Sequence, residues 1–320
     1  MVKSDNHKES GYPRELQKVL NYINHNLAGD VSLETLAGIA SYSPFHFQKI
    51  FSLNLTESPK QYVMRLRLER AAHHLKNYYD LPVTEIAMGC GFSSPSVFSR
   101  AFRNYYGITA ETFREMPLQD LSVILEQKKQ RNMENNLYSR NESDLWIDQI
   151  VDPADILLKT HITPPPVIKF LSSIKIACIH TTLSHPENIS FVFKSLMRWA
   201  IPNDIVTPDT RYIGIGLDVP FYTSPDKCRY IAAIEVKKDV KPNKGISIFE
   251  ISEGKFASFQ MAGTLESTIN HLITLNHNYL ADMGYEMTEI IWYEIFSECP
   301  AYRSYADIYK NIWVPVKPRM

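Results

Sequence analysis

The chain has 320 residues, of which 44% are hydrophobic and 22% are charged, and its 34 Lys and Arg residues nearly balance its 35 Asp and Glu residues. This length suits two or three globular domains, and no apolar run approaches the roughly 18–20 residues of a bilayer span, so we expect no membrane segment. The four cysteines (Cys90, Cys178, Cys228 and Cys299) lie far apart without a CxxC pair, which predicts reduced thiols and argues against a disulfide framework or a zinc site.

The start of the chain is polar. The sequence MVKSDNHKESGY has no apolar segment behind it and therefore lacks the pattern of a signal peptide, so we expect a cytoplasmic protein. The spacing of the apolar residues in 13–28 then predicts a helix with one buried face.

One stretch of about 20 residues occurs twice. Residues 31–51 read VSLETLAGIASYSPFHFQKIF, and residues 81–102 read LPVTEIAMGCGFSSPSVFSRAF. In each copy a short helix is followed by a turn and by a second helix that Ser-Pro opens, because serine caps free N–H groups and proline suits the first helical position. The pattern predicts two helix-turn-helix units.

In each second helix the apolar and polar residues fall on opposite faces. Phe47 and Phe51 in the first copy correspond to Phe98 and Phe102 in the second, and both pairs are predicted to be buried. A helical domain with merely solvated polar faces would show the same pattern, but two matched copies favour a pair of DNA-reading units.

A long helix is predicted between the two copies, within residues 58–80. About 18 helical residues span roughly 27 Å, which is close to the roughly 34 Å between successive major-groove faces on one side of B-DNA. The helix could therefore hold two recognition helices in neighbouring grooves. His73 and His74 point about 100° apart on it, and no third ligand is near, so we expect no metal site.

Residues 13–114, which include IAMGCGFSSPSVFSRAFRNYYGITAETFR, resemble the DNA-binding domain of the AraC/XylS transcription regulators. The resemblance implies that bases are read by Phe45, Gln48 and Lys49 in the first recognition helix and by Ser96, Val97 and Arg100 in the second. The chemistry agrees, because Gln can bind adenine, Lys and Arg can reach guanine, and an aromatic ring or Val can touch a thymine methyl.

The second half of the chain contains another duplication. After a polar linker at 116–160 and the run TPPP at 163–166, residues 161–320 follow the pattern strand–helix–strand–strand twice. We therefore expect an α+β multidomain protein: an all-α double helix-turn-helix domain at 1–115, the linker, and an α+β domain in which two such units form an antiparallel sheet backed by two helices.

The predicted strand IIWYEIF suggests a ligand site. Alternation places Trp292, Glu294 and Phe296 on one face, and a carboxylate between two aromatic rings suits an organic cation. In RYIGIGL, Tyr212 shares a face with Gly214 and Gly216, which predicts open space beside that tyrosine. Alternatively, Glu294 pairs with Lys or Arg at a sheet edge. Asp218 and Arg229 are expected to form a structural pair.

Residues 160–320, with IGIGLDVP, GKFASFQMAG, WYEIF and IWVPVK, resemble the gyrase-inhibitor-like (GyrI-like) effector-binding domain. The order of the two domains resembles the Rob-type arrangement. The resemblance implies that Glu294 faces the ligand and that Trp199 lines the pocket, although Trp199 also fits a core position. Phe296 stands where members often have Tyr, which removes a hydroxyl from the site.

These features predict a transcription regulator and not an enzyme. Its expected partners are double-stranded promoter DNA, a small lipophilic or cationic effector and RNA polymerase, and no cofactor is implied. Two alternatives concern the C-terminal domain. It could hydrolyse strained-ring molecules with Glu294 and Tyr212 as acid and base, or it could bind a protein instead of a ligand.

Overall fold

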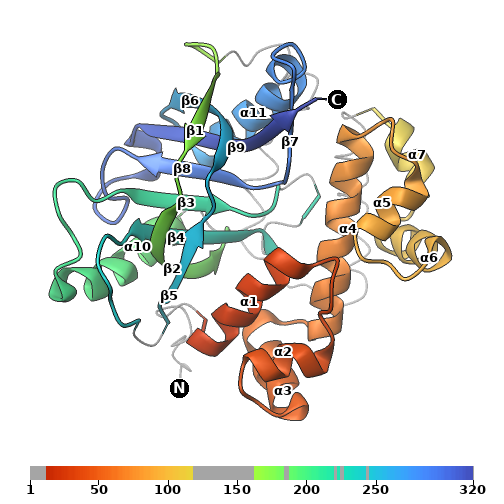
Figure 1. Ribbon diagram of the computed structural model, residues 1–320, viewed down its shortest axis with the longest axis horizontal. Helices are drawn as coiled ribbons and strands as arrows, with labels where there is room; N and C mark the ends of the chain where they lie inside the picture. The colour runs from red at the N-terminus through yellow and green to blue at the C-terminus, as the bar shows by residue number, and fades with distance from the viewer. Residues whose placement is uncertain are drawn as a thin grey trace, which may run out of the picture. The chain divides into compact units, whose positions relative to one another are not determined.

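The computed structural model describes residues 12–117, 162–183, 187–219, 222–223, 227–242 and 245–319. The chain divides into two compact units, Pro13–Arg140 and a second unit that joins Met1–Tyr12 to Asn141–Met320. Each unit is described by itself (Figure 1). Beyond residue 117, the expected linker at 116–160 lies outside the described residues.

The first unit is all-helical across its described residues, as predicted. Its helices are α1 (Arg14–Asn26), α2 (Leu33–Ile39), α3 (Pro44–Leu55), α4 (Pro59–Asn77), α5 (Val83–Gly89), α6 (Pro95–Tyr106) and α7 (Ala110–Glu115). The pairs α2–α3 and α5–α6 are the two predicted helix-turn-helix units. The predicted long helix between them is α4, which has 19 residues.

Local sequence explains where the second helix of each unit begins. The side chain of Ser43 accepts a hydrogen bond from the N–H of His46, and Ser94 does the same for Val97. Each serine is followed by a proline in the first turn, where the missing N–H costs no helical bond. Both recognition helices are therefore started by the Ser-Pro pair that the sequence repeats.

The turns of the two units have the same backbone conformation but different residues. Gly91 has a φ of 88° in the second turn, and Ser41 takes a φ of 55° at the matching place in the first. A Cβ at Gly91 would lie 2.8 Å from the Cα of Ala28 and 2.9 Å from the Arg67 side chain. The close approach of these groups requires glycine in the second unit.

The second unit contains strands and helices in the predicted order. Its strands are β1 (Val167–Leu171), β2 (Ile174–Thr182), β3 (Tyr212–Gly216), β4 (Arg229–Glu235), β5 (Ser247–Ile251), β6 (Gly254–Met261), β7 (Tyr285–Met287), β8 (Trp292–Phe296) and β9 (Lys310–Pro318). Its helices are α10 (Glu187–Ala200) and α11 (Leu265–Thr274), and α11 continues into a π-helical turn at Leu275–Tyr279.

The strands form an antiparallel sheet in the order β1-β6-β9-β8-β3-β4-β2-β5, with β7 paired to β9. The duplication has an offset of 80 residues, as from Val167 at the start of β1 to Ser247 at the start of β5, and β3 repeats as β8 at the same offset. The two halves meet where β3 pairs with β8, with Gly214 opposite Glu294.

The first strand of each half pairs with the other half. β1 lies beside β6, and β5 lies beside β2. The two repeats therefore exchange strands and do not form two separate sheets. Side chains from α10 and α11 share one buried cluster with one face of the sheet, whereas Ile176, Ile213 and Phe256 belong to a second cluster on the opposite face.

Candidate functional sites

The six predicted DNA-reading side chains are all exposed on the two recognition helices. Phe45 is 82% exposed and Val97 is 41% exposed, although both are apolar residues that usually avoid water. The others are Gln48, Lys49, Ser96 and Arg100. The helix faces opposite them are buried, because Phe47 and Phe51 on α3 and Phe98 and Phe102 on α6 are at most 1% exposed.

The polar members of this set are available for a ligand. Among the described residues, the side chains of Gln48, Lys49 and Arg100 form no hydrogen bond or ion pair. A cation or amide without an internal partner can bind phosphate or a base edge without first breaking a contact. The geometry is thus compatible with base reading by both helices, and their roles stay predictions.

The C-terminal domain brings the predicted ligand residues to its helix-covered face. Trp292, Glu294 and Phe296 alternate with more exposed neighbours along β8, as expected. Trp199 from α10 and the half-buried Tyr212 from β3 belong to the same apolar cluster as Trp292 and Phe296.

Glu294 is fully buried, and other side chains already bind both of its oxygens. The hydroxyl of Tyr230 donates to Oε2 at 2.6 Å, and the hydroxyl of Tyr305 donates to Oε1 at 2.5 Å. The indole Nε1 of Trp292 lies 3.4 Å from Oε1. The carboxylate is therefore held by three buried donors, which is how a protein interior stabilises a carboxylate away from water.

A buried lysine lies beside this group. Lys310 donates from Nζ to the carbonyls of Gly263 at 2.9 Å and Tyr305 at 3.2 Å, and Nζ lies 3.5 Å from the centre of the Tyr305 ring. Burial lowers the pKa of Lys310 to about 8, and the negative charge of Glu294 partly opposes that shift. Glu294 thus has a cation of the chain itself in its electrostatic surroundings.

The expectation of open space beside Gly214 and Gly216 was wrong. A Cβ at Gly214 would lie 1.9 Å from the hydroxyl oxygen of Tyr230, and a Cβ at Gly216 would lie 2.1 Å from the indole of Trp292. The two glycines make room for these side chains, which lie directly over β3. The space is filled by the residues that surround Glu294.

Tyr212 does not pair with Glu294. It lies opposite Phe296 in the β3–β8 register, and Cys299 and Tyr302 are near enough for their charges to affect its pKa, which burial raises. The hydroxyls that reach Glu294 come from Tyr230 and Tyr305. The hydrolase alternative requires substrate or water to join Glu294 and Tyr212, since the two side chains make no direct hydrogen bond in the described part of the chain, and it stays a prediction.

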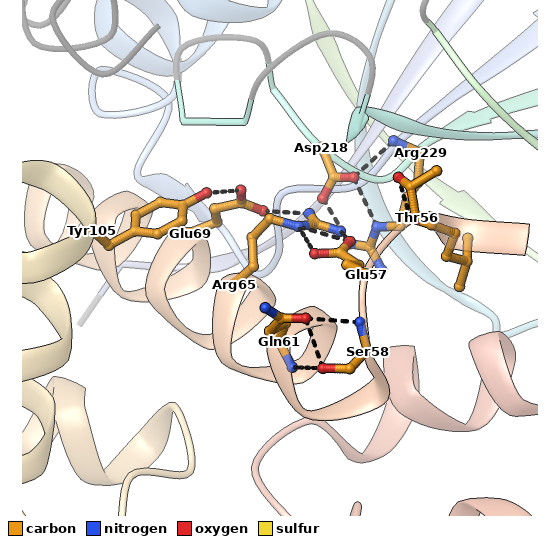
Figure 2. A network of polar contacts seen from close by, with 10 residues as sticks. Thr56, Glu57, Ser58, Gln61, Arg65, Glu69, Tyr105, Asp218 and Arg229 are labelled. Atoms are coloured by element: carbon orange, nitrogen blue, oxygen red, sulfur yellow. Dashed lines mark hydrogen bonds and ion pairs between the residues drawn. The ribbon is translucent and has the colours of Figure 1, made fainter. Parts of the chain in front are cut away.

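The structure also bears on the expected ion pair, the cysteines, and the search for metal sites and membrane-spanning helices. Asp218 and Arg229 form the predicted ion pair, with Nη2 of Arg229 2.7 Å from Oδ1 of Asp218 (Figure 2). No disulfide joins any of the four cysteines, all of which lie in the described residues. In the parts of the chain that the structure describes, no group of three or more His, Cys, Asp or Glu residues could hold a metal ion, and no helix has the length and apolar character needed to cross a bilayer.

Comparison with known proteins gives two family matches. Residues 36–116 match the model of a helix-turn-helix domain, and residues 164–317 match the model of a GyrI-like small molecule binding domain. The second match covers β1 to β8 and most of β9, together with Glu294 and its hydrogen-bond donors.

Two curated relatives each match about a third of the chain. The chain is 34% identical over 94 residues to the probable transcriptional regulator LumQ of Photobacterium leiognathi, across 29% of this chain and 38% of LumQ. It is 28% identical over 110 residues to the multiple antibiotic resistance protein MarA of Escherichia coli, across 34% of this chain and 86% of MarA. The chain thus spans little more than a third of the length of LumQ.

Among solved structures, the C-terminal domain of EcmrR is similar to 48% of this chain and is itself 97% covered, with 14% identity and a TM-score of 0.37. The two family matches thus show a helix-turn-helix domain followed by a GyrI-like small molecule binding domain, in the predicted order.

Proposed function

We propose that the chain is a sequence-specific DNA-binding transcription regulator whose C-terminal domain binds a small-molecule effector and that acts on RNA polymerase at promoters. The observation that supports it most is the duplication: α3 and α6 start with the same Ser-Pro cap and bury the same aromatic pair. Both leave side chains able to read bases exposed. Two such helices in one chain allow a monomer to read two neighbouring half-sites.

The test is binding of the full chain to a duplex that it selects from a randomised library. Lys49→Ala and Arg100→Ala should each weaken binding about 10- to 100-fold, because one good contact to a base contributes about 1–3 kcal/mol of discrimination. Lys18→Ala removes the same charge from the exposed face of α1 and should change affinity little. Selection of no duplex, or equal binding by all these proteins, would contradict the proposal.

For the effector we propose a small lipophilic or cationic molecule that binds at Glu294. Support comes from the buried carboxylate between Trp292 and Phe296 and from the matched small-molecule-binding family. Because Glu294 is fully buried and the hydroxyls of Tyr230 and Tyr305 cover its two oxygens, such a cation can reach the carboxylate only if the surrounding side chains move. Binding at this carboxylate therefore requires local rearrangement.

Thermal shift measurements with quaternary ammonium and phosphonium ions test this part. The melting temperature of the full chain should rise with ion concentration, because a ligand of the folded state stabilises it. Glu294→Gln should lose the shift. Glu298→Gln, which alters an exposed ion pair with Arg303, should keep it. If no ion stabilises the wild-type chain, a protein partner becomes the better explanation.

A further inference from the structure

A chain of buried polar groups crosses the helical domain at α4 (Figure 2). Arg65 donates from Nε and Nη2 to Glu57, with the shortest contact at 2.6 Å, and from Nη1 to Glu69 at 3.1 Å. Glu69 in turn accepts a hydrogen bond of 2.6 Å from the hydroxyl of Tyr105. We call Glu57, Arg65, Glu69 and Tyr105 the α4 network.

The two ends of the α4 network belong to the two recognition helices. Glu57 directly follows Thr56, the C-cap of α3, and Tyr105 lies in the last turn of α6. Arg65 and Glu69 lie one turn apart on α4. The C-terminal ends of both recognition helices are therefore attached to two neighbouring side chains of the helix between them.

The start of α4 is fixed at the same place. Ser58 accepts a hydrogen bond from the N–H of Gln61, and the side chain of Gln61 accepts one from the N–H of Ser58 at 2.9 Å. This reciprocal cap sets the direction in which the chain leaves α3 and enters α4. Glu57 therefore cannot follow a moving α3 without breaking both the cap and its contacts to Arg65.

Because the charged side chains of the α4 network are buried, displacing any of them from its partner is costly. The side chains of Arg65, Glu57 and Glu69 are only 5%, 9% and 5% exposed. Burial pulls the pKa of Arg65 down, but Glu69 and Glu57 outweigh it and raise that pKa well above its ordinary value, so the guanidinium stays charged. Paired buried charges contribute little net stability. If one partner moves away, however, the other charge is left buried without compensation, which is costly. Such a network therefore favours one arrangement of the helices that carry it.

We propose that the α4 network sets the relative position of the two recognition helices and so determines which separation between two DNA half-sites the chain accepts. The proposal rests on the proposed function. One added base pair displaces a half-site by about 3.4 Å and rotates it by about a tenth of a turn, since a turn of B-DNA spans roughly 34 Å and 10 base pairs. A domain whose two recognition helices have a fixed relative position cannot bind both displaced half-sites, whereas a domain in which they can move relative to each other can.

The experiment compares three duplexes: the one selected by the wild-type full chain, and versions with one base pair inserted or deleted between its two half-sites. For the wild type, either change should weaken binding at least about tenfold. In Tyr105→Phe, which removes only the hydroxyl that joins α6 to Glu69, the loss caused by insertion or deletion should shrink at least about threefold, a coupling typical of residues in one network. Arg65→Lys keeps the charge but loses the planar fork, and should act in the same direction.

Tyr22→Phe is the matched control, because it removes a hydroxyl of α1 that bonds the carbonyl of Asp30 at 3.2 Å outside the network. It should keep the wild-type response to spacing, and thermal melting should show that every variant is folded. If Tyr105→Phe folds, binds and keeps the full spacing response, the inference is overturned. The same holds if the wild type selects a duplex but tolerates all three spacings. If the wild type selects no duplex, the proposed function itself fails.

Discussion

His180 is a buried histidine in β2 whose protonation is coupled to folding. It is 4% exposed, and its Nε2 has no hydrogen-bond partner among the described residues. Burial, assisted by the positive charge of Arg229, lowers its pKa from 6.5 to about 3. Between these values the unfolded chain binds a proton that the folded chain does not, so stability should fall as the pH falls through this window.

The expected size follows from the linkage relation. From pH 8 to pH 5, His180 alone should remove about 2 kcal/mol from the free energy of unfolding of the C-terminal domain. Asparagine does not titrate, so the His180→Asn variant should lose about 2 kcal/mol less of its free energy of unfolding between pH 8 and pH 5. Denaturant unfolding at several pH values gives the free energy of unfolding of the wild type and of the variant. If the two values fall in parallel as the pH falls, His180 does not cause the loss of stability.

The surroundings of Glu294 show how far a site can be predicted at the level of single residues. Alternation within one strand was enough to group Glu294 with Trp292 and Phe296, because side chains of a strand take opposite faces in turn. Tyr230 shares its face with Ala232 and Ile234 by the same rule, but its contact with Glu294 depends on β4 lying next to β3. Tyr305 comes from a short 3₁₀ turn, and no periodic pattern points to it.

At the level of elements, the two recognition helices end alike with different residues. The C-cap of α3 is Thr56 with a φ of 57°, and the C-cap of α6 is Gly107 with a φ of 83°. Glycine adopts this left-handed conformation freely, whereas a β-branched residue is strained there by roughly 1 kcal/mol or more. The first unit therefore contains a strained cap that the second unit avoids.

Exchanging these two caps tests the strain. Thr56→Gly should raise the free energy of unfolding of the helical domain by about 1 kcal/mol, and Gly107→Thr should lower it by at least as much. Chemical denaturation of each variant gives the values. A loss of stability in Thr56→Gly would mean that the bond of the Thr56 hydroxyl to the carbonyl of Leu55, at 2.7 Å, outweighs the strain.

Elements with strong periodicity or a clear start signal were predicted well. The long helix expected within 58–80 is α4, and the helix expected in the first strand–helix–strand–strand unit is α10. The strands β1 and β5, with five residues each, were not predicted, because short edge strands bury little and carry weak alternation. The exposed polar faces of α3 and α6 followed from the duplicated pattern, whereas their base-reading role comes from the family resemblance and stays a prediction.

At the level of the whole C-terminal domain, the exchange of strands between the two halves could not be read from either repeat. Each repeat is consistent with a sheet of its own, and only the pairing of β1 with β6 and of β5 with β2 shows that each half completes the other. The offset of 80 residues holds across these exchanged strands. We therefore expect the two halves to unfold as one cooperative unit.

Hydrogen exchange tests this cooperativity. Ile176 is fully buried in β2, between partners in β4 and β5, and Ile176→Ala should cost about 2–5 kcal/mol through the cavity that it leaves. If the halves unfold together, amides of β6 and β9 should lose as much protection as those of β2 and β4, because all of them exchange through global opening.

Two further variants complete the test. Phe256→Ala, at the equivalent place in β6, should lower the hydrogen-exchange protection of the amides in both halves to the same extent. Lys175→Ala, on the exposed side of β2, should leave the amide protection of both halves almost unchanged. Wild-type protection of β9 in Ile176→Ala would instead show two halves that open independently despite their exchanged strands.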